Sequence, residues 1–236
     1  MPITFEHIAC KSLNLRNEEK RQYAGIQALG VLKADVDQLG LLMSCGIKEA
    51  HLTISRLATL SRQLNFFFAV YLPHLLKTDA TFMDVYTVFA GGDDLFLIGP
   101  WNRVVELAGL LQKRFADYTC HNPEVHFSAG ITLQKPHTPL HKLSEDTEDA
   151  LEKAKAGNPT KQERGNCVNL FGETATWDEF VELRNITRRL DKWRKEGLVN
   201  NAMLFRINRF IGMVAQEKEL DMGKGIQIED MECLKW

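Results

Sequence analysis

The spacing of hydrophobic and polar positions changes several times along the chain, and each change predicts an element. The run LGVLKADV at residues 29–36 is short and apolar, which is typical of a buried strand. A helical period follows over residues 39–77, and we expect a break near Cys45-Gly46. Two further apolar runs flank Gly91-Gly92-Asp93-Asp94 and predict a hairpin, because glycine supplies the positive φ that a tight turn needs.

The second half of the chain continues the alternation. Residues 102–118 have an amphipathic helical stripe, HFSAGITL at 126–133 predicts a strand, 145–156 a helix, and NCVNLF at 166–171 a last strand. The order β-α-β-β-α-β is the ferredoxin-like motif, here extended by a helix and a strand. We therefore predict an α+β fold with an antiparallel central sheet and helices on one face.

The two ends of the chain differ from this middle part. Residues 1–27 are polar without a clear period and are interpreted as a lead-in arm or linker, so the βαββαβ domain spans 28–175. From residue 176 two helices are predicted, 177–195 and 199–218, separated by Gly197, and they form a small helical subdomain at 176–236. The ending MECLKW has apolar residues with no sequence left to cover them, so we expect this subdomain to be truncated.

Basic residues crowd the first of these two helices. The ordinary interpretation of such a run is a solvated helix face, and a contact with an RNA backbone or another subunit is the alternative. The residues are Arg184, Arg188, Arg189, Lys192, Arg194 and Lys195.

Composition and charge narrow the class of protein. Hydrophobic residues make up 44% and charged residues 25%, as in an ordinary globular protein, and the net charge is −2. This charge argues against coating of nucleic acid through bulk charge. The five cysteines form no C-x-x-C pair, so we expect reduced, mostly buried thiols in a cytoplasmic protein without a zinc site. The sequence has no signal peptide or membrane-spanning segment, and no membrane partner is expected.

Candidate chemistry gathers at the hairpin. A ferredoxin-like order places the first strand beside the hairpin strands, so Asp35 should lie next to Asp93 and Asp94. Three carboxylates without a cation repel one another, whereas oxygen ligands suit two Mg²⁺ or Mn²⁺ ions of the kind used in nucleotidyl transfer. A GGDD string alone would equally fit an ordinary turn with solvated aspartates.

Two other segments favour a phosphate site. Asp37-Gln38-Leu39-Gly40 leads into a helix, whose first backbone N–H groups suit a triphosphate. Lys153 and Lys155 lie on a short helix before the last strand and point about 200° apart, so only one can face the site. We favour Lys155 as the phosphate contact, and a pair of surface lysines is the alternative.

These residues also carry a family resemblance. ADVD at 34–37, AGGDD at 90–94, SAGI at 128–131 and ALEKAKAGN at 150–158 fall in the order of the GGDEF/nucleotide-cyclase palm superfamily. The longer strings LGVLKADVDQLG, SRLATLSRQLNFFF and YTVFAGGDDLFLIGPW resemble the second palm domain of the large subunit of type III-A CRISPR effector complexes. The likeness covers about residues 28–171, and the helical tail resembles the start of that subunit's C-terminal helical domain.

The resemblance implies an activity, its substrate and its partners. In that family the palm converts ATP into cyclic oligoadenylate second messengers when the complex, with its guide RNA, binds foreign target RNA. The expected partners are the other subunits of the complex, guide and target RNA, and a second palm domain.

The resemblance also implies site residues. Asp35, Asp93 and Asp94 would be catalytic and, together with Val36, would hold two Mg²⁺ or Mn²⁺ ions. ATP would be bound by Asp37, Leu39, Gly40, Gly91, Gly92 and Lys155. Ser55 and Ser61 would be candidate contacts for its adenine.

Departures from related cyclases refine this expectation. Met43 stands where diguanylate cyclases carry a guanine-reading Asn, and Gly40 stands where they carry Lys, so both changes disfavour a GTP cyclase. Ser55 and Ser61 are equally well explained as helix-surface or cap residues. The chain has no His-Asp nuclease motif, no zinc module and no first palm, so we expect it to supply half of a two-palm site, which homodimerisation could also recreate.

Other functions remain as alternatives. In the leading hypothesis the domain is a nucleotidyltransferase palm that is inactive as an isolated fragment. A non-catalytic nucleotide-binding scaffold that docks other subunits and RNA is the second hypothesis. A diguanylate cyclase is disfavoured by Met43 and Gly40, and a conventional polymerase by the lack of a thumb-like or template-binding module.

Overall fold

A computed structural model of the chain describes residues 4–17, 22–157 and 164–221. The chain divides into two compact units, residues 1–181 and 182–236. The expectation of a truncated subdomain depends on the ending MECLKW, which lies outside the described residues.

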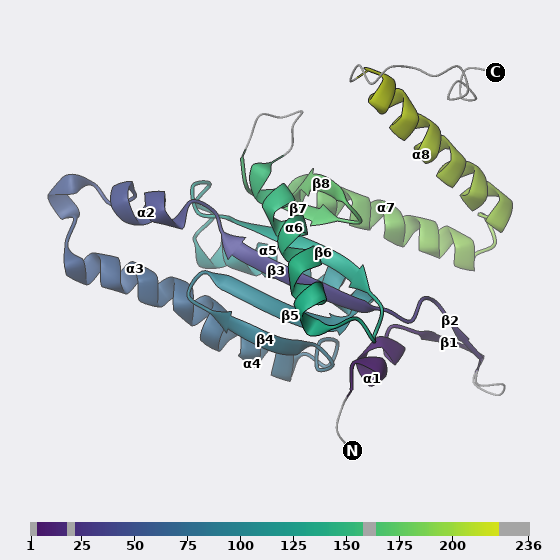
Figure 1. The fold of residues 1–236 in the computed structure, drawn as a ribbon, viewed down its shortest axis with the longest axis horizontal. Coiled ribbons are helices and arrows are strands. Elements are labelled where there is room, and N and C mark those ends of the chain that lie inside the picture. The colour runs from purple at the N-terminus through teal and green to yellow at the C-terminus, as the bar shows by residue number, and fades with distance from the viewer. Residues whose placement is uncertain (1–3, 18–21, 158–163, 222–236) are drawn as a thin grey trace. The chain divides into compact units, whose positions relative to one another are not determined.

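The first unit is built on a six-stranded sheet with the strand order β4-β5-β3-β6-β7-β8 (Figure 1). Neighbouring strands are antiparallel except β6 and β7, which run parallel. The first four strands in this order, β4-β5-β3-β6, form the antiparallel ferredoxin-like sheet, so the predicted α+β class is confirmed. The strands are β3 (Leu29–Val36), β4 (Tyr86–Gly91), β5 (Asp94–Pro100), β6 (Phe127–Gln134), β7 (Cys167–Leu170) and β8 (Glu173–Thr176).

The helices of the βαββαβ motif lie on one face of this sheet, as predicted. A Cβ at Gly30 of β3 would lie 2.7 Å from Trp101 Cα, so α5 (Trp101–Tyr118) packs directly on the strand. The long helical stretch before β4 is interrupted after Gly46, close to the predicted break. Its segments are α2 (Leu39–Cys45), η1 (Glu49–His51), α3 (Ile54–Phe66), the π-helical turn η2 (Phe67–Tyr71) and α4 (Leu72–Thr78).

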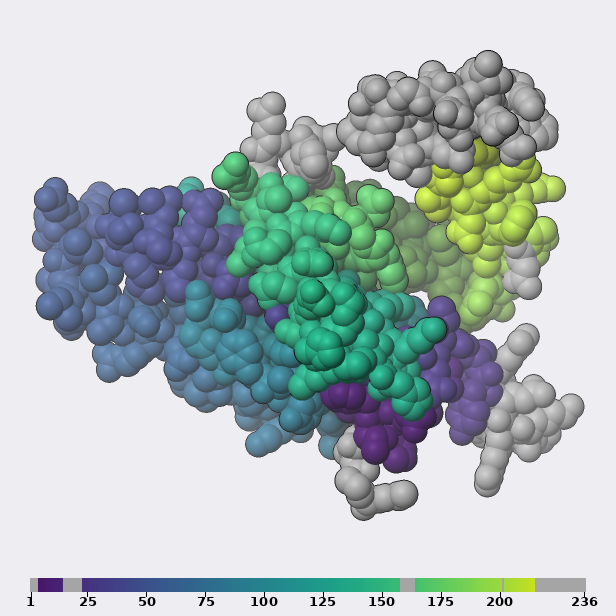
Figure 2. Space-filling model, viewed as in Figure 1, coloured from purple at the N-terminus to yellow at the C-terminus, as the bar shows by residue number. Residues whose placement is uncertain are grey.

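The added helix α6 (Leu140–Ala156) covers the opposite face. Gly130 of β6 pairs with Lys33, three residues from Gly30, and side chains alternate along a strand, so Gly130 faces away from α5. A Cβ at Gly130 would lie 2.7 Å from Ala150 C and Thr147 O of α6. Figure 1 shows α6 in front of the sheet and α5 behind it, and in Figure 2 the side chains of α6 cover the middle of the sheet. The helix begins at Leu140, earlier than the predicted residue 145.

Aromatic side chains form the centre of the core on the α5 face. Phe67 and Phe68 of η2 meet Phe115 of α5 with ring centroids 5.1 and 5.8 Å apart. The rings continue through Phe127 to Trp177, whose indole N–H donates to the Phe127 carbonyl at 2.9 Å. The first turn of α7 (Trp177–Lys195) thus belongs to the first unit, which ends at residue 181, and the domain bounds 28–175 and 176–236 stay predictions.

The N-terminal residues are more structured than their polar composition suggests. They form α1 (Phe5–Cys10), β1 (Asn14–Asn17) and β2 (Gln22–Ala24). Thr4 and His7 cap α1 reciprocally, and Ile8 and Ala9 are buried on the α6 side of the sheet, in a cluster with Leu29, Val31, Phe96, Ile98 and Leu143. A helix of six residues is too short to show a period, which explains why the sequence pattern missed it.

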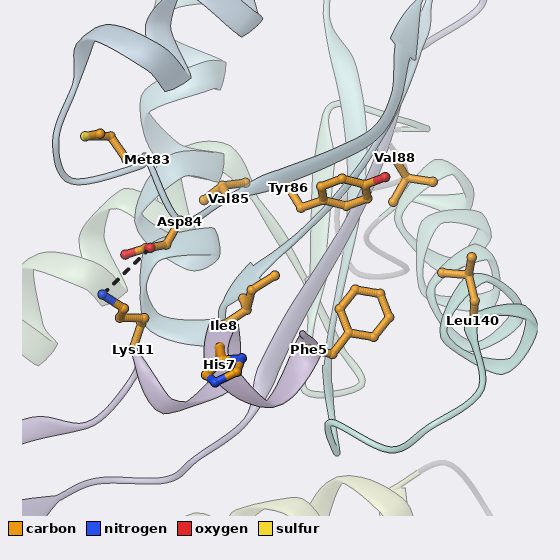
Figure 3. Close-up of a pocket in the computed structure, with 10 residues that line it drawn as sticks. All are labelled: Phe5, His7, Ile8, Lys11, Met83, Asp84, Val85, Tyr86, Val88 and Leu140. Carbon is orange, nitrogen blue, oxygen red and sulfur yellow. Dashed lines mark ion pairs between the residues drawn. The ribbon is translucent and has the colours of Figure 1, made fainter. Parts of the chain in front are cut away.

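A groove runs between α1 and the edge strand β4 (Figure 3). It has a volume of about 960 Å³, and an ion pair between Lys11 and Asp84, 4.0 Å long, lies at one side. Its apolar lining, which Figure 3 labels, is Phe5, Ile8, Met83, Val85, Tyr86, Val88 and Leu140. Tyr86 pairs with Ile98 whereas Gly91 pairs with Asp94, so the groove lies at the end of β4 away from the GGDD hairpin.

The second unit contains the rest of α7 and α8 (Asn201–Asp221). Gly197, at φ +76, follows the end of α7, as predicted for the stop signal, and α8 begins at Asn201. Part of the basic run on α7 is paired within the helix: Lys192 with Glu196, and Arg194 and Lys195 with Asp191. Such i,i+3 and i,i+4 pairs are typical of a solvated helix face.

The cysteine prediction is partly wrong. Among the cysteines in the described part of the chain, Cys10, Cys45 and Cys120 are exposed and Cys167 is buried, which contradicts the expectation of mostly buried thiols. Cys233 lies outside the described residues. Within residues 4–17, 22–157 and 164–221, no helix has the length and apolar character needed to cross a membrane.

Gly130 gives a test of how closely α6 packs. We expect Gly130→Ala to lower the free energy of unfolding by about 1–3 kcal/mol, because the added methyl group meets helix backbone that can move only with the whole of α6. Gly212→Ala is the matched control, since nothing lies within 4 Å of its Cβ position in α8. Chemical denaturation of both variants checks this, and equal stability of Gly130→Ala and the unsubstituted chain would contradict it.

Candidate functional site

The three predicted carboxylates meet at the ends of β3 and β5. Asp35 is paired with Asp94 in the antiparallel register, and Gly92, at φ +67, allows the tight turn that puts Asp93 beside them. Oxygen atoms of Asp35, Asp93 and Asp94 all lie within 4.8 Å of one another. The Val36 N–H donates to the Asp93 carbonyl at 3.2 Å and ties the end of β3 to the hairpin.

Lys155 supplies the positive charge next to this cluster. Its Nζ lies 2.9 Å from Asp35 Oδ2 and 3.6 Å from Glu152, and it reaches the cluster from the last turn of α6. Lys153 is exposed on the same helix, so Lys155 is the lysine that faces the carboxylates, as the helical angle between the two required.

Burial and the Lys155 ammonium act in opposite directions on the pKa of Asp35. Burial raises the pKa of Asp35 to about 6, and the charges of Asp93 and Asp94 raise it too, while the Lys155 ammonium acts in the lowering direction. Burial alone would lower the pKa of Lys155, but its hydrogen bond and charge interaction with Asp35 outweigh this and raise it. Asp35 is thus a carboxylate whose ionised form needs a neighbouring cation.

A cavity of about 510 Å³ opens beside Asp35 and Lys155. Arg164 and Gly165 line it, and neither belongs to the predicted set. They lie just before β7, which runs parallel to β6 and therefore starts at the sheet edge where the antiparallel strand β3 ends. That parallel pairing is the signal that could have located them. Among the described residues, the lining is Asp35, Asp37, Gln38, Lys155, Arg164 and Gly165.

Asp37 lines this cavity but its carboxylate is already held by the chain. It accepts the Ser128 hydroxyl at 2.7 Å and the Asn166 N–H at 2.8 Å, and His126 Nδ1 lies 2.7 Å from Oδ2. A Cβ at Gly165 would lie 2.7 Å from Asp37 Cγ, so glycine is needed for this approach. These contacts give Asp37 a structural role in joining β3, β6 and the start of β7, and its predicted nucleotide contact stays a prediction.

The remaining predicted residues are placed as follows. Leu39 and Gly40 begin α2 after Gln38, whose φ is +51, and Leu39 packs partly against the core while Gly40 is exposed. Ser55 and Ser61 are exposed on α3, and among the described residues the lining of the cavity at Asp35 includes neither. Their roles as nucleotide contacts stay predictions.

One polar contact at the hairpin was not foreseen. Asn65 Oδ1, from α3, accepts the Gly92 N–H at 2.8 Å, and a Cβ at Gly91 would lie 3.4 Å from the same oxygen. The sequence shows Asn65 only as a polar residue in an apolar helix, so the contact depends on tertiary structure.

Fold and site together define a palm-type domain: a ferredoxin-like sheet with three carboxylates where β3 ends and β5 begins. The family model described as Cas10/Cmr2, second palm domain, matches residues 28–164. The chain belongs to this family and carries its second palm.

The relatives are large subunits of type III-A CRISPR systems. The chain is 34% identical over 180 residues, 70% of its length, to a protein of Methanocaldococcus jannaschii named CRISPR system single-strand-specific deoxyribonuclease Cas10/Csm1 (subtype III-A). It is 38% identical over 158 residues, 67% of its length, to the protein of that name from Enterococcus italicus. These matches cover 22% and 20% of the relatives, so the chain spans about a fifth of their length.

Solved structures of related subunits share the fold. Csm1 of T. onnurineus matches with a TM-score of 0.60 and 26% identity over 77% of this chain and 26% of that one. A Csm1–Csm4 cassette in complex with one ATP matches with a TM-score of 0.61 and 25% identity over 80% of this chain and 26% of that one. The palm assignment therefore agrees in sequence and in three dimensions.

The role of Asp37 can be tested by stability. We expect Asp37→Ala to lower the free energy of unfolding by about 2–4 kcal/mol, because it removes the acceptor of the buried Ser128 hydroxyl and of the part-buried Asn166 N–H. Asp84→Ala, which removes an exposed carboxylate with a 4.0 Å ion pair, should change stability by less than about 1 kcal/mol. Urea denaturation measures both, and equal effects would contradict a structural role for Asp37.

Proposed function

We propose that this chain is the ATP-using nucleotidyltransferase palm of a type III CRISPR large subunit and that it makes cyclic oligoadenylate second messengers. The observation that carries the proposal is the cluster of Asp35, Asp93 and Asp94 with oxygens within 4.8 Å, next to a lysine and a cavity. The related Csm1–Csm4 cassette that was solved in complex with one ATP, at 25% identity, supports the same substrate for this chain.

The donor set fits divalent cations. Asp35, Asp93, Asp94 and the Val36 carbonyl would hold two Mg²⁺ or Mn²⁺ ions, which prefer oxygen ligands. Such ions lower the pKa of an attacking hydroxyl and offset charge on the phosphate during in-line displacement. The raised pKa of Asp35 agrees with a carboxylate that is stabilised as an anion by bound cations.

The residues of the chain have separate parts in this reaction. Lys155 pairs with Asp35 in this structure, and its ammonium would contact the triphosphate. Arg164 adds a second positive charge at the same cavity. Gly92 has open space where a Cβ would lie, so the triphosphate can approach the hairpin backbone. The 3′-hydroxyl of one nucleotide attacks the α-phosphate of the next ATP, and pyrophosphate leaves.

The active site requires a second palm domain that faces this one. The chain spans about a fifth of the length of its relatives, and such a subunit has room for that second domain. Other subunits of the complex, guide RNA and target RNA are its partners, and target RNA binding is the signal that starts synthesis. The isolated chain is expected to bind ATP and metal without turnover.

The catalytic role of the hairpin gives the direct test. In the assembled complex with target RNA, ATP and Mn²⁺, Asp93→Ala/Asp94→Ala should reduce oligoadenylate at least about 100-fold, because lost metal ligands forfeit several kcal/mol of transition-state stabilisation. Asp84→Ala, an exposed carboxylate elsewhere in the same unit, is the matched control and should leave product formation unchanged.

Chromatographic quantification of the oligoadenylate products distinguishes a catalytic palm from a nucleotide-binding scaffold. Unchanged synthesis in the Asp93→Ala/Asp94→Ala complex, with ATP binding retained, would replace the catalytic proposal by a nucleotide-binding scaffold. Preferential binding of GTP would point to a diguanylate cyclase.

Metal affinity should depend on pH through Asp35. Its pKa of about 6 lies above the ordinary 3.8, so the proton competes with metal below pH 6 and the competition disappears above it. The apparent Mn²⁺ affinity of the chain should therefore fall by up to about tenfold per pH unit below pH 6.

The variant Lys155→Met provides a second test of the pH dependence of Mn²⁺ affinity. Lys155 acts to lower the pKa of Asp35, so its removal should move the loss of Mn²⁺ affinity to higher pH. Titration calorimetry between pH 5 and pH 8 follows both proteins. A pH-independent affinity in the unsubstituted chain would exclude Asp35 from the metal site.

A further inference from the structure

Asn65 reaches the GGDD hairpin from outside the sheet. Its Oδ1 accepts the Gly92 N–H at 2.8 Å and lies 3.4 Å from the position a Cβ would take at Gly91. One amide oxygen thus lies against both glycines of the hairpin, directly before Asp93. The contact joins segments that are 27 residues apart in sequence.

The backbone of Asn65 is held by the core although its side chain is exposed. The next turn, η2, buries Phe67 and Phe68 almost completely, with exposed fractions of 1% and 0%. These rings pack on Phe115 of α5. The turn is π-helical, a local distortion of the kind often found at functional sites. α3 and α4 lie beside β4 in Figure 1, so the core sets the position from which Asn65 meets the hairpin.

We propose that Asn65 is a positioning residue for the carboxylate cluster. By holding the Gly92 N–H it fixes the turn that aims Asp93 and Asp94 at Asp35, while the Val36 N–H holds the Asp93 carbonyl from the other side. Asn65 itself touches neither the cations nor the nucleotide. The inference rests on the proposed function, because it assigns Asn65 a role in that metal site.

Three variants separate this role from a general effect on the helix. Asn65→Ala removes the acceptor, and Asn65→Asp keeps an acceptor oxygen of the same reach. Gln63→Ala is the matched control: Gln63 lies on the same helix, and its side chain binds the Tyr118 hydroxyl at 2.6 Å instead of the hairpin. Asn65 and Gln63 are both exposed, so all three chains are expected to fold.

The primary readout is Mn²⁺ binding to the full chain at pH 7.5, by titration with electron paramagnetic resonance. Asn65→Ala should bind Mn²⁺ about three- to tenfold more weakly, the effect of one lost hydrogen bond. Asn65→Asp should bind at least as tightly as the unsubstituted chain, and Gln63→Ala should be unchanged. The melting temperatures of Asn65→Ala and Gln63→Ala should fall by similar small amounts, because each variant loses one side-chain hydrogen bond. A weaker Mn²⁺ affinity in Asn65→Ala alone then reports on the metal site and not on stability.

The rate of amide hydrogen exchange at Gly92 reports on its hydrogen bond with Asn65 in the absence of metal. Exchange should be faster in Asn65→Ala and unchanged in Asn65→Asp and Gln63→Ala. Unchanged Mn²⁺ affinity in Asn65→Ala, or equal weakening by Asn65→Asp or Gln63→Ala, overturns the inference and leaves the proposed function intact. Absence of Mn²⁺ binding by the unsubstituted chain overturns the metal site of the proposed function and this inference with it.

Discussion

The antiparallel register between β3 and β5 is the constraint on which the site depends. It places Asp35 opposite Asp94, and the same register pairs Leu32 with Leu97 in the core and Gly30 with Gly99 under α5. A slip of one residue would turn every side chain of β3 to the other face, so burial of the apolar residues also fixes the position of the carboxylate. The cluster of acids is thus held in place by hydrophobic packing at the other end of the same strand.

The added helix α6 decides what this cluster can do. Three carboxylates this close are unfavourable on their own, and the counter-charge arrives from Lys155 at the end of α6. The helix can lie near enough only because Gly130 leaves room for its backbone. A ferredoxin-like motif without this extension would keep the three acids and lose both the lysine and one wall of the cavity.

The sequence predicts the parts of this arrangement that depend on local pattern. Apolar runs and a glycine turn indicate β3 and the hairpin, and the ferredoxin-like order then brings Asp35 to Asp93 and Asp94. The contacts of Asp37 could not be predicted this way, because they require knowledge that β7 lies parallel to β6 and starts beside the end of β3. Helix α1 is too short for a period, and the exposure of Cys10 depends on how that helix packs.

The site is held from both faces of the sheet. Asn65 holds the turn of the hairpin from the helices of the motif, which pack on the α5 face, whereas Lys155 pairs with Asp35 of β3 from α6 on the other face. The directions of the carboxylates are therefore set by one layer of helices, and their negative charge is offset by the other. Because the sheet lies between the two layers, sequence changes that repack one of them can alter the direction of the acids without altering their charge, or the reverse.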